Sequence, residues 1–415
     1  MRVFRSCVIV AGVMALCGCG GGGGSDNNIV HAASDVKVNG IAAGSTFSFD
    51  LGIVVNGKYF LTDRNNKSVD MVDVATHTIT YITGTGANAF AGCKPTANCV
   101  GANNGLSGPD GINWITGTNF LFVGDVNNVR VVDMTTSTVV KSIQVGTAGF
   151  RADEGCFDAD DHIYMISIPD ADLPYAAFIN TDTQTVIGFV NWVDTDGATP
   201  AGGNEQCQYD AGTKSFLVNN DNTIANPHGE VDVIPAADIK SMVVGSTANI
   251  FTLAGVKRFP LGVCDPTGLT LGPGTDMMAE CRPGDAGAQL TSIIMNRTNG
   301  QIVTTLAVGG GDQVTYDART NRYYIAASRW HASGVNDLGG GCSATNPCVP
   351  TLFVVDADTH NVLPHISTGN NAHSVAVDPV SGQIFVPYSS ATAPAGCATC
   401  AANGFIDGGI SVFSL

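Results

Sequence analysis

Short apolar runs separated by polar turns recur along this chain at a nearly constant spacing. One phrase consists of an apolar pair, an acidic or amide residue, a few polar residues and a second apolar run. It occurs at 71–79, 131–140, 178–187, 294–303 and 354–363, in weaker form at 233–243, and finally at 410–415. Its central residues, Asp73, Asp133, Asn180, Pro235, Asn296, Asp356 and Ser414, lie 47 to 61 residues apart. This spacing indicates seven copies of one structural unit.

A second phrase, a polar turn followed by an apolar strand, precedes each copy of the first. It occurs at 56–61, 116–123, 158–166, 210–218, 265–271, 317–326 and 378–386. Asp or Asn with Gly or Thr between apolar runs is typical of β-hairpins. Each unit therefore holds two hairpins, which give four short antiparallel strands, named a to d. Seven such units predict an all-β, seven-bladed β-propeller.

The two ends of the repeat array predict how the ring closes. The last unit stops after its third strand, and the segment around 29–38 precedes the first unit without another partner. We expect this N-terminal segment to supply the missing outer strand, because a closed ring leaves fewer exposed sheet edges.

The phrases at 131–146 and 353–369, with the segment 373–386 that follows, resemble the repeats of YVTN/lactonase-like propellers. The resemblance covers nearly the whole chain after the N-terminal leader and implies the propeller fold. It does not select a function, since propellers of this kind include binding proteins, scaffolds and enzymes.

Composition and charge narrow the possible partners. Only 13% of residues are charged, which suits blades that bury both faces against their neighbours. The net charge of −17 disfavours binding to nucleic acids and to anionic membrane surfaces.

The N-terminus predicts export. Arg2 and Arg5 precede an apolar run over 7–16 that is too short to span a bilayer and has the form of a signal peptide. Residues 16–19, Leu-Cys-Gly-Cys, resemble the bacterial lipobox. The resemblance implies a signal peptide over 1–18 and a lipid on Cys19, and Gly20 in place of Asp implies the outer membrane. We expect a Gly-rich tether over 19–28, a propeller over 29–415 and membrane contact through the anchor alone. The alternative is an ordinary secretory signal that is cleaved elsewhere.

The remaining ten cysteines form neighbouring pairs: 93/99, 156/207, 264/281, 342/348 and 397/400. An even number in an exported chain predicts disulfides. The C-x5-C frames at 93–99 and 342–348 predict loop staples. We expect a structural disulfide in CATC at 397–400, with a redox motif or a zinc site as alternatives.

In a propeller, the a–b and c–d turns lie on one face and the b–c and d–a loops on the other. We expect the first set to be uniformly short and all insertions to fall on the second, the loop-rich face. These insertions are 84–108, 169–175, 219–230, 329–350 and 389–408. Three cysteine pairs lie in them, so functional loops are the preferred interpretation and neutral insertion is the alternative.

The innermost strands begin at the loop-rich face, beside the central channel. Counting back from the a–b turns places Asp110, Asp153 or Glu154, Glu205, Asp312 and His373 there, whereas unit one offers only Ser48 and unit five Pro260 or Leu261. Converging carboxylates repel each other unless neutralised, and Ca²⁺ or Mg²⁺ prefers oxygen ligands. Asp110, Glu154, Glu205, Asp312 and His373 are therefore the candidate metal ligands. Alternatively, these acids cap backbone N–H groups or hold channel water.

Four further residues of the loop-rich face are candidates. Arg329, Trp330 and His331 form a candidate ligand-binding group, in which Trp330 could stack on a sugar or an aromatic ligand or simply pack a loop. His228 lies in another of these loops.

Two functions fit these observations, and whether the protein is an enzyme is left open. The first is a monomeric binding protein that holds a small molecule, a glycan or a protein on the loop-rich face. The alternative is a lactonase-type hydrolase or lyase dependent on Ca²⁺ or Mg²⁺. In that case His373, His228 or His331 would act as acid or base.

Overall fold

The computed structural model describes residues 30–31, 35–41, 46–96, 99–282, 289–331, 342, 346–391, 397 and 399–414. The expected signal peptide over 1–18, the tether over 19–28 and the lipidation site Cys19 lie outside the described residues and stay predictions. No helix in the described part of the chain is long and apolar enough to cross a membrane.

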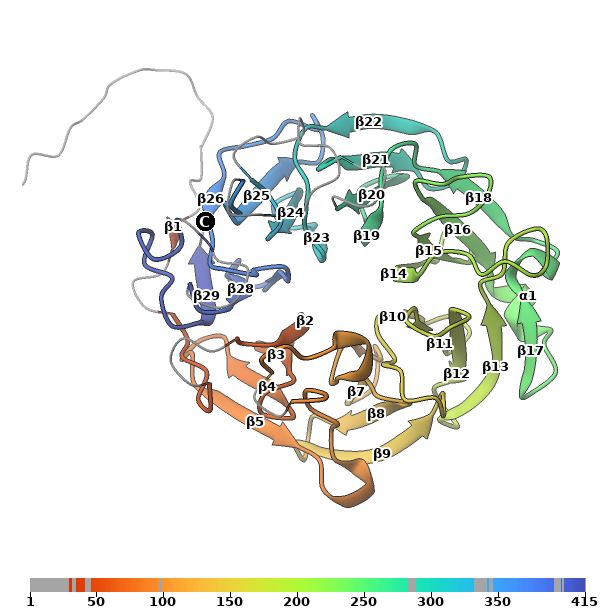
Figure 1. The fold of residues 1–415 in the computed structure, drawn as a ribbon, viewed down its shortest axis with the longest axis horizontal. Helices are drawn as coiled ribbons and strands as arrows, with labels where there is room; N and C mark the ends of the chain where they lie inside the picture. The colour runs from red at the N-terminus through yellow and green to blue at the C-terminus, as the bar shows by residue number, and fades with distance from the viewer. Residues whose placement is uncertain are drawn as a thin grey trace, which may run out of the picture.

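Seven sheets stand around a central channel, which confirms the predicted propeller (Figure 1). Blade 1 contains β2 (Phe49–Val55), β3 (Lys58–Asp63), β4 (Ser68–Asp73) and β5 (Ile79–Thr83). Blade 2 contains β6 (Ile112–Trp114), β7 (Phe120–Asp125), β8 (Asn128–Asp133) and β9 (Thr138–Gln144). Blade 3 contains β10 (Gly155–Asp158), β11 (Ile163–Ile168), β12 (Tyr175–Asn180) and β13 (Thr185–Asn191), and blade 4 contains β14 (Asn204–Asp210), β15 (Ser215–Asn220), β16 (Glu230–Pro235) and β18 (Lys257–Pro260).

The other three blades follow the same order. Blade 5 contains β19 (Pro266–Leu271), β20 (Asp276–Cys281), β21 (Ser292–Asn296) and β22 (Ile302–Leu306). Blade 6 contains β23 (Val314–Asp317), β24 (Arg322–Ala327), β25 (Thr351–Asp356) and β26 (Ile366–Ser367). Blade 7 contains β27 (Ala376–Val377), β28 (Ile384–Tyr388), β29 (Gly409–Ser414) and β1 (Val30–His31). Two short 3₁₀ helices, η1 (Gly86–Asn88) and η2 (Asn104–Leu106), lie in the loop between blades 1 and 2.

The hydrophobic core lies between the faces of neighbouring blades. Leu51 and Phe60 of blade 1, for example, pack with Leu121 and Val123 of blade 2, and all four are almost fully buried. Because each blade is covered on both faces, few positions remain for charged side chains.

The ring closes as the sequence predicts. The N-terminal strand β1 pairs antiparallel with β29 and forms the outer strand of blade 7. Two backbone hydrogen bonds of 2.9 Å between Val36 and Ile410 extend this pairing.

The repeated phrase shapes the c–d turns. In blade 1 the Asp73 carboxylate accepts hydrogen bonds from the backbone N–H groups of Ala75 and Thr76. Asp356 accepts one in the same way from Thr359 in blade 6. Such local bonds replace backbone partners that a tight turn cannot supply. The acidic residue of the phrase is therefore part of the scaffold.

One expectation is wrong: the a–b and c–d turns are not uniformly short. Between β16 and β18 lie α1 (Ala236–Lys240), β17 (Ser246–Asn249) and η3 (Ile250–Thr252). The segment 233–243 is thus no full copy of the hairpin phrase, because its Ala-Ala-Asp-Ile-Lys core favours a helix after Pro235. β17 pairs in parallel with β13 and gives blade 3 a fifth strand.

Candidate functional site at the channel mouth

The starts of the innermost strands and the long loop after blade 1 enclose a cavity of about 420 Å³. We call it the channel-mouth cavity. Its ionisable lining residues are Asp50, Arg64, Arg151, Asp153, Glu154, Glu205, Arg282, Asp312, Arg329 and His373. Five of them are acids and four are arginines, so a site of mixed charge stands at the loop-rich end of the channel.

The predicted candidate metal ligands gather here. The cavity is lined by four of them, Glu154, Glu205, Asp312 and His373. Asp153, which the sequence offered as the alternative to Glu154, lines it too. Asp110 is fully buried behind the lining and contacts the cavity residue Arg64. The residues found by counting back from the a–b turns therefore lie together at one end of the channel.

Asp50 is the acid that the sequence analysis missed in unit one. It lies in β2, where the pairing with β3 shifts register between Phe49 and Gly52. Because a bulge of this kind inserts an extra residue, counting back from the turn points to the wrong position in the strand. The sequence did carry one signal, because the acidic Asp50 stands in the otherwise weakly polar stretch Phe-Ser-Phe-Asp-Leu at 47–51. In the structure Asp50 is only 5% exposed.

Arg64, which was also missed, joins two of these acids. Its Nε and Nη2 lie 2.9 and 2.5 Å from Asp110 Oδ1, and Nη2 lies 3.2 Å from Asp50 Oδ1. Its Nη1 donates to the carbonyl of Phe49 at 2.7 Å. Burial raises the pKa of Asp110 to about 8, although Arg64 opposes the shift.

The other three arginines are paired as well. Arg151 contacts Asp153 and Asp170, both at 2.7 Å. The remaining pairs are Arg282 with Asp221, Asp265 and Glu205 at 3.1, 3.2 and 3.5 Å, and Arg329 with Asp312 at 3.7 Å. Arg64 and Arg282 directly follow the b strands β3 and β20. A search of this weakly charged chain for basic residues at the ends of b strands would have found both.

His373 is held in a defined orientation. Its ring stacks on Phe49 with 4.5 Å between ring centres, and Nδ1 lies 2.7 Å from the carbonyl oxygen of Asn371. That oxygen only accepts, so Nδ1 carries the proton and a neutral ring leaves Nε2 as the acceptor. Burial lowers the pKa of His373, while Asp312 and Asp50 oppose the shift, so the ring is neutral at pH 7.

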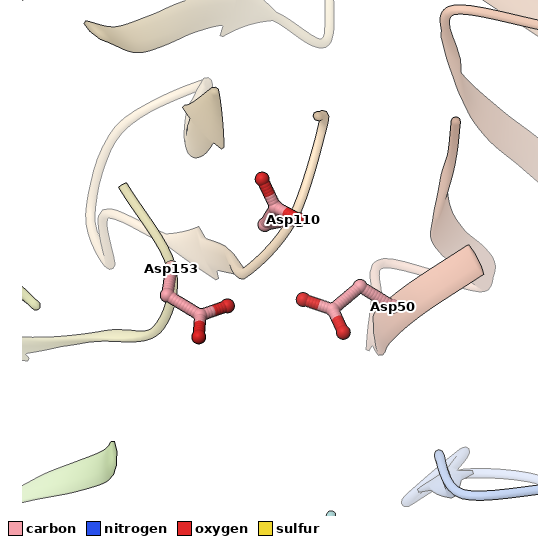
Figure 2. Close-up of side chains that lie close together, drawn as sticks. All are labelled: Asp50, Asp110 and Asp153. Carbon is pink, nitrogen blue, oxygen red and sulfur yellow. The ribbon is translucent and has the colours of Figure 1, made fainter. Parts of the chain in front are cut away.

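Three aspartates in the described part of the chain form a compact acidic group. Carboxylate oxygens of Asp50, Asp110 and Asp153 lie within 4.8 Å of one another, and Figure 2 shows Asp50 and Asp153 pointing toward each other from opposite sides. Burial raises the pKa of Asp153 well above its usual value even though Arg151 opposes the shift. A buried group of this kind could hold a metal ion.

The cavity also contains a carboxylate oxygen without a hydrogen-bond partner. Glu154 Oε2 is buried and makes no hydrogen bond, and the same is true of Asp50 Oδ2 and Asp110 Oδ2. Burial, followed by the charge of Asp153, raises the pKa of Glu154 well above its usual value. The arginines therefore leave several carboxyl oxygens that the fold has buried here without a hydrogen-bond partner.

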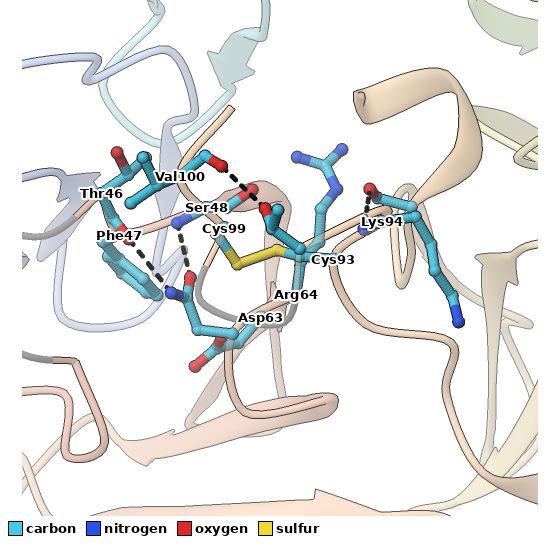
Figure 3. Close-up of a disulfide and its surroundings, with 12 residues drawn as sticks. Thr46, Phe47, Ser48, Asp63, Arg64, Cys93, Lys94, Cys99 and Val100 are labelled. Atoms are coloured by element: carbon cyan, nitrogen blue, oxygen red, sulfur yellow. Dashed lines mark hydrogen bonds between the residues drawn. A yellow bond between two sulfur atoms is a disulfide. The ribbon is translucent and has the colours of Figure 1, made fainter. Parts of the chain in front are cut away.

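The Cys93–Cys99 disulfide staples the loop that forms one wall of the cavity. Cys99, Gly101, Ala102 and Asn104 of this loop line the cavity, and Figure 3 shows the disulfide together with Ser48 and Arg64, which also line it. Cys156–Cys207 links β10 to β14, two residues beyond Glu154 and Glu205. Two disulfides thus fix parts of the cavity lining.

The remaining predicted pairs are bonded too. They are Cys264–Cys281, next to Arg282, together with Cys342–Cys348 and Cys397–Cys400. Cys397 and Cys400 are both buried, in agreement with a structural disulfide. Five disulfides indicate a protein of an oxidising, extracytoplasmic compartment.

Of the other predicted ligand residues, Arg329 reaches this cavity and Trp330, His331 and His228 do not line it. Arg329 lines it, but Trp330 packs edge to face against Phe353, with 5.0 Å between ring centres. His331 is fully buried and forms a β-bridge with Cys348. His228 lines a smaller cavity of about 170 Å³, which shares Arg282 with the channel-mouth cavity.

Comparisons with known proteins support the fold and no more. No protein-family model matches the chain, and no curated protein sequence matches it. Among solved structures, it is similar to hydrazine synthase of Kuenenia stuttgartiensis, with a TM-score of 0.57 and 13% identity over 85% of this chain and 94% of that one. It is also similar to a chain in the crystal structure of the mitotic checkpoint complex, with a TM-score of 0.56 and 9% identity over 91% and 95%. At these identities the chain is shown to share the β-propeller fold.

Proposed function

We propose that this protein is an extracytoplasmic binding protein that takes a small, positively charged ligand into the channel-mouth cavity. The observation that carries the proposal is the excess of carboxyl groups over basic groups at the cavity, with some buried carboxyl oxygens left without a hydrogen-bond partner. Five lining acids and Asp110 face four arginines, each of which already contacts a carboxylate. A cationic ligand would satisfy the buried oxygens that remain.

The cellular context is part of this proposal. The five disulfides fit an oxidising compartment, and the lipobox-like residues 16–19 supply a membrane anchor through Cys19. The YVTN-like phrases are compatible with a binding role. Replacing Cys19 by Ala should move the protein from the outer-membrane fraction to the soluble fraction. Unchanged fractionation, or no lipid on the wild-type chain, would argue against the anchor.

A ligand screen tests the binding proposal. The full chain, purified in detergent, is mixed with amino acids, amino sugars and polyamines in the presence of a chelator, and thermal unfolding is followed. We expect at least one amine to raise the midpoint, and Glu154→Gln to weaken this effect. Asp172→Asn removes an exposed acid and serves as the matched control. If no compound shifts the midpoint, the proposal is wrong.

His373 favours a second candidate, a metal-dependent lactonase-type hydrolase or lyase. Its Nε2 accepts a proton in the neutral ring and lies 3.9 Å from Asp50 Oδ1. A divalent cation bound nearby would polarise a substrate carbonyl, and His373 would receive the proton of a water or of a substrate carbon. Chelator-sensitive turnover of a lactone panel that His373→Gln abolishes would support this candidate. Absence of turnover with Ca²⁺ or Mg²⁺ would leave the binding function.

A further inference from the structure

We propose that the cation site of the cavity is a calcium site formed by Asp50, Asp110 and Asp153. The inference rests on the proposed function, because it names the ion that the acidic wall of the same cavity would bind. It differs from the ligand set expected from the sequence, which shares Asp110 with this trio and gave Asp153 as the alternative to Glu154.

The spacing of the three carboxylates suits calcium. Their nearest oxygens all lie within 4.8 Å of one another. Oxygen ligands at about 2.3–2.6 Å from Ca²⁺ lie at most about 5 Å apart on opposite sides of the ion, whereas Mg²⁺ needs about 2.0–2.1 Å and strict octahedral geometry. The trio can therefore surround Ca²⁺ with little movement.

The arginines leave part of the trio open. Arg64 contacts Oδ1 of both Asp50 and Asp110, while Oδ2 of each is buried without a hydrogen-bond partner. Arg151 contacts Oδ2 of Asp153. The two guanidinium groups reduce repulsion among the acids, and unsatisfied acceptor oxygens still remain.

Glu154 is a second and independent indication of a ligand. It lies outside the trio, lines the same cavity and is only 5% exposed, yet its Oε2 has no hydrogen-bond partner. An unpaired carboxylate buried beside Asp153 is costly unless a cation or a donor compensates it. Glu154 is thus placed to receive water bound to the ion or a ligand group.

The backbone fixes two members of the trio relative to each other. Gly111 donates its N–H to the carbonyl of Asp153 at 2.8 Å, and Asp110 donates its N–H to Gly124 at 2.9 Å. A Cβ atom on Gly111 would lie 2.2 Å from the Asp153 carbonyl oxygen. Glycine at 111 therefore permits the approach that brings Asp110 and Asp153 together. This preorganisation reduces the cost of gathering the ligands.

Calorimetric titration of the full chain in detergent, after treatment with a chelator, tests the inference. We expect Ca²⁺ to bind and Mg²⁺ to bind more weakly. Asp153→Asn and Asp50→Asn, which keep side-chain size, should each weaken calcium binding at least about tenfold, since even indirect partners of a metal contribute 10–100-fold. The matched control is Asp172→Asn, which removes an exposed acid outside the cavity and should leave calcium affinity unchanged.

The outcomes separate the two proposals. Absence of calcium binding overturns the inference, as does full affinity in Asp153→Asn and Asp50→Asn variants that melt like the wild type. If Ca²⁺ does not bind but an amine still binds in the presence of chelator, the proposed binding function stands and only the calcium assignment is wrong. If neither Ca²⁺ nor any amine binds, the proposed binding function and the calcium site are both wrong. Binding of Mg²⁺ in preference to Ca²⁺ overturns the calcium assignment.

Discussion

Single buried carboxyl groups show how the protein responds to pH. Glu280 in β20 is fully buried and accepts hydrogen bonds from Ser292 Oγ at 3.0 Å and from the Gly311 N–H at 3.4 Å. Burial raises its pKa from 4.5 to about 8, and the Ser292 hydrogen bond opposes the shift. Between these values the folded chain retains a proton that the unfolded chain releases, so this group's contribution to stability falls as pH rises.

Glu280→Gln should therefore stabilise the protein at alkaline pH. The amide cannot ionise, so the variant should gain about 1–2 kcal/mol in unfolding free energy over the wild type near pH 8 and almost nothing near pH 5. Thermal unfolding across this range measures the difference, with the exposed Asp172→Asn as control. An equal difference at both pH values would contradict the assigned cause.

The residues of the site were only partly predictable from sequence. Glu205 and Asp312 could be placed at the channel because counting back from an a–b turn gives the start of each innermost strand. Asp50 was hidden by a register shift between Phe49 and Gly52. Arg64 and Arg282 were not predicted because their partners, Asp110 for Arg64 and Glu205 for Arg282, are distant in sequence and become neighbours only when blades pack side by side.

At the scale of elements, blades 2 and 3 depend on close backbone contact at the site. A Cβ on Gly111 would collide with backbone atoms of Asp153 and Glu154. We expect Gly111→Ala to lower the unfolding free energy by about 2–4 kcal/mol. Gly212→Ala is the control, since the nearest atom, 3.3 Å away, belongs to the Asp210 side chain. Equal stability of the two variants would show that the inner strands adjust freely.

The Cys156–Cys207 disulfide should stabilise the junction between blades 3 and 4. It closes a loop with a sequence separation of 51 residues, for which the loss of chain entropy in the unfolded state predicts about 4 kcal/mol. Replacing both cysteines by Ser should lower stability by up to this amount. The double replacement of Cys93 and Cys99, separated by 6 residues, should cost less. Denaturant unfolding compares the two, and the reverse order would contradict the prediction.

Strands were the elements most readily predicted, because the period of apolar runs and turns repeats seven times. The helix α1 and the parallel strand β17 were not predicted. The segment around Pro235 keeps part of the hairpin phrase and so looks like an ordinary turn between strands. The strand β17 that follows it pairs with β13, which belongs to the preceding blade. Long-range pairing of that kind leaves no local periodic signal.

For the whole molecule, closure depends on a short N-terminal strand. β1 and Val36 cover the edge of β29, which would otherwise be open. Deletion of residues 30–38 should lower the thermal midpoint and promote self-association, because an exposed strand edge pairs with other chains. Deletion of the glycines 20–24 should change neither property. Unfolding curves and size-exclusion chromatography would show the difference, and identical behaviour of the two deletions would contradict closure by β1.

The ring also brings the site together. Asp50, Asp110 and Asp153 come from the beginnings of three successive blades, and closure of the ring adds His373, whose ring stacks on Phe49.

An anomalous difference map from crystals grown with calcium tests the central claim most directly. The calcium proposal predicts a single strong peak at the channel mouth, within about 2.3–2.6 Å of carboxylate oxygens from Asp50, Asp110 and Asp153. The peak should disappear in Asp153→Asn crystals. A wild-type map without a peak there, with Arg64 and Arg151 alone neutralising the three acids, would contradict it.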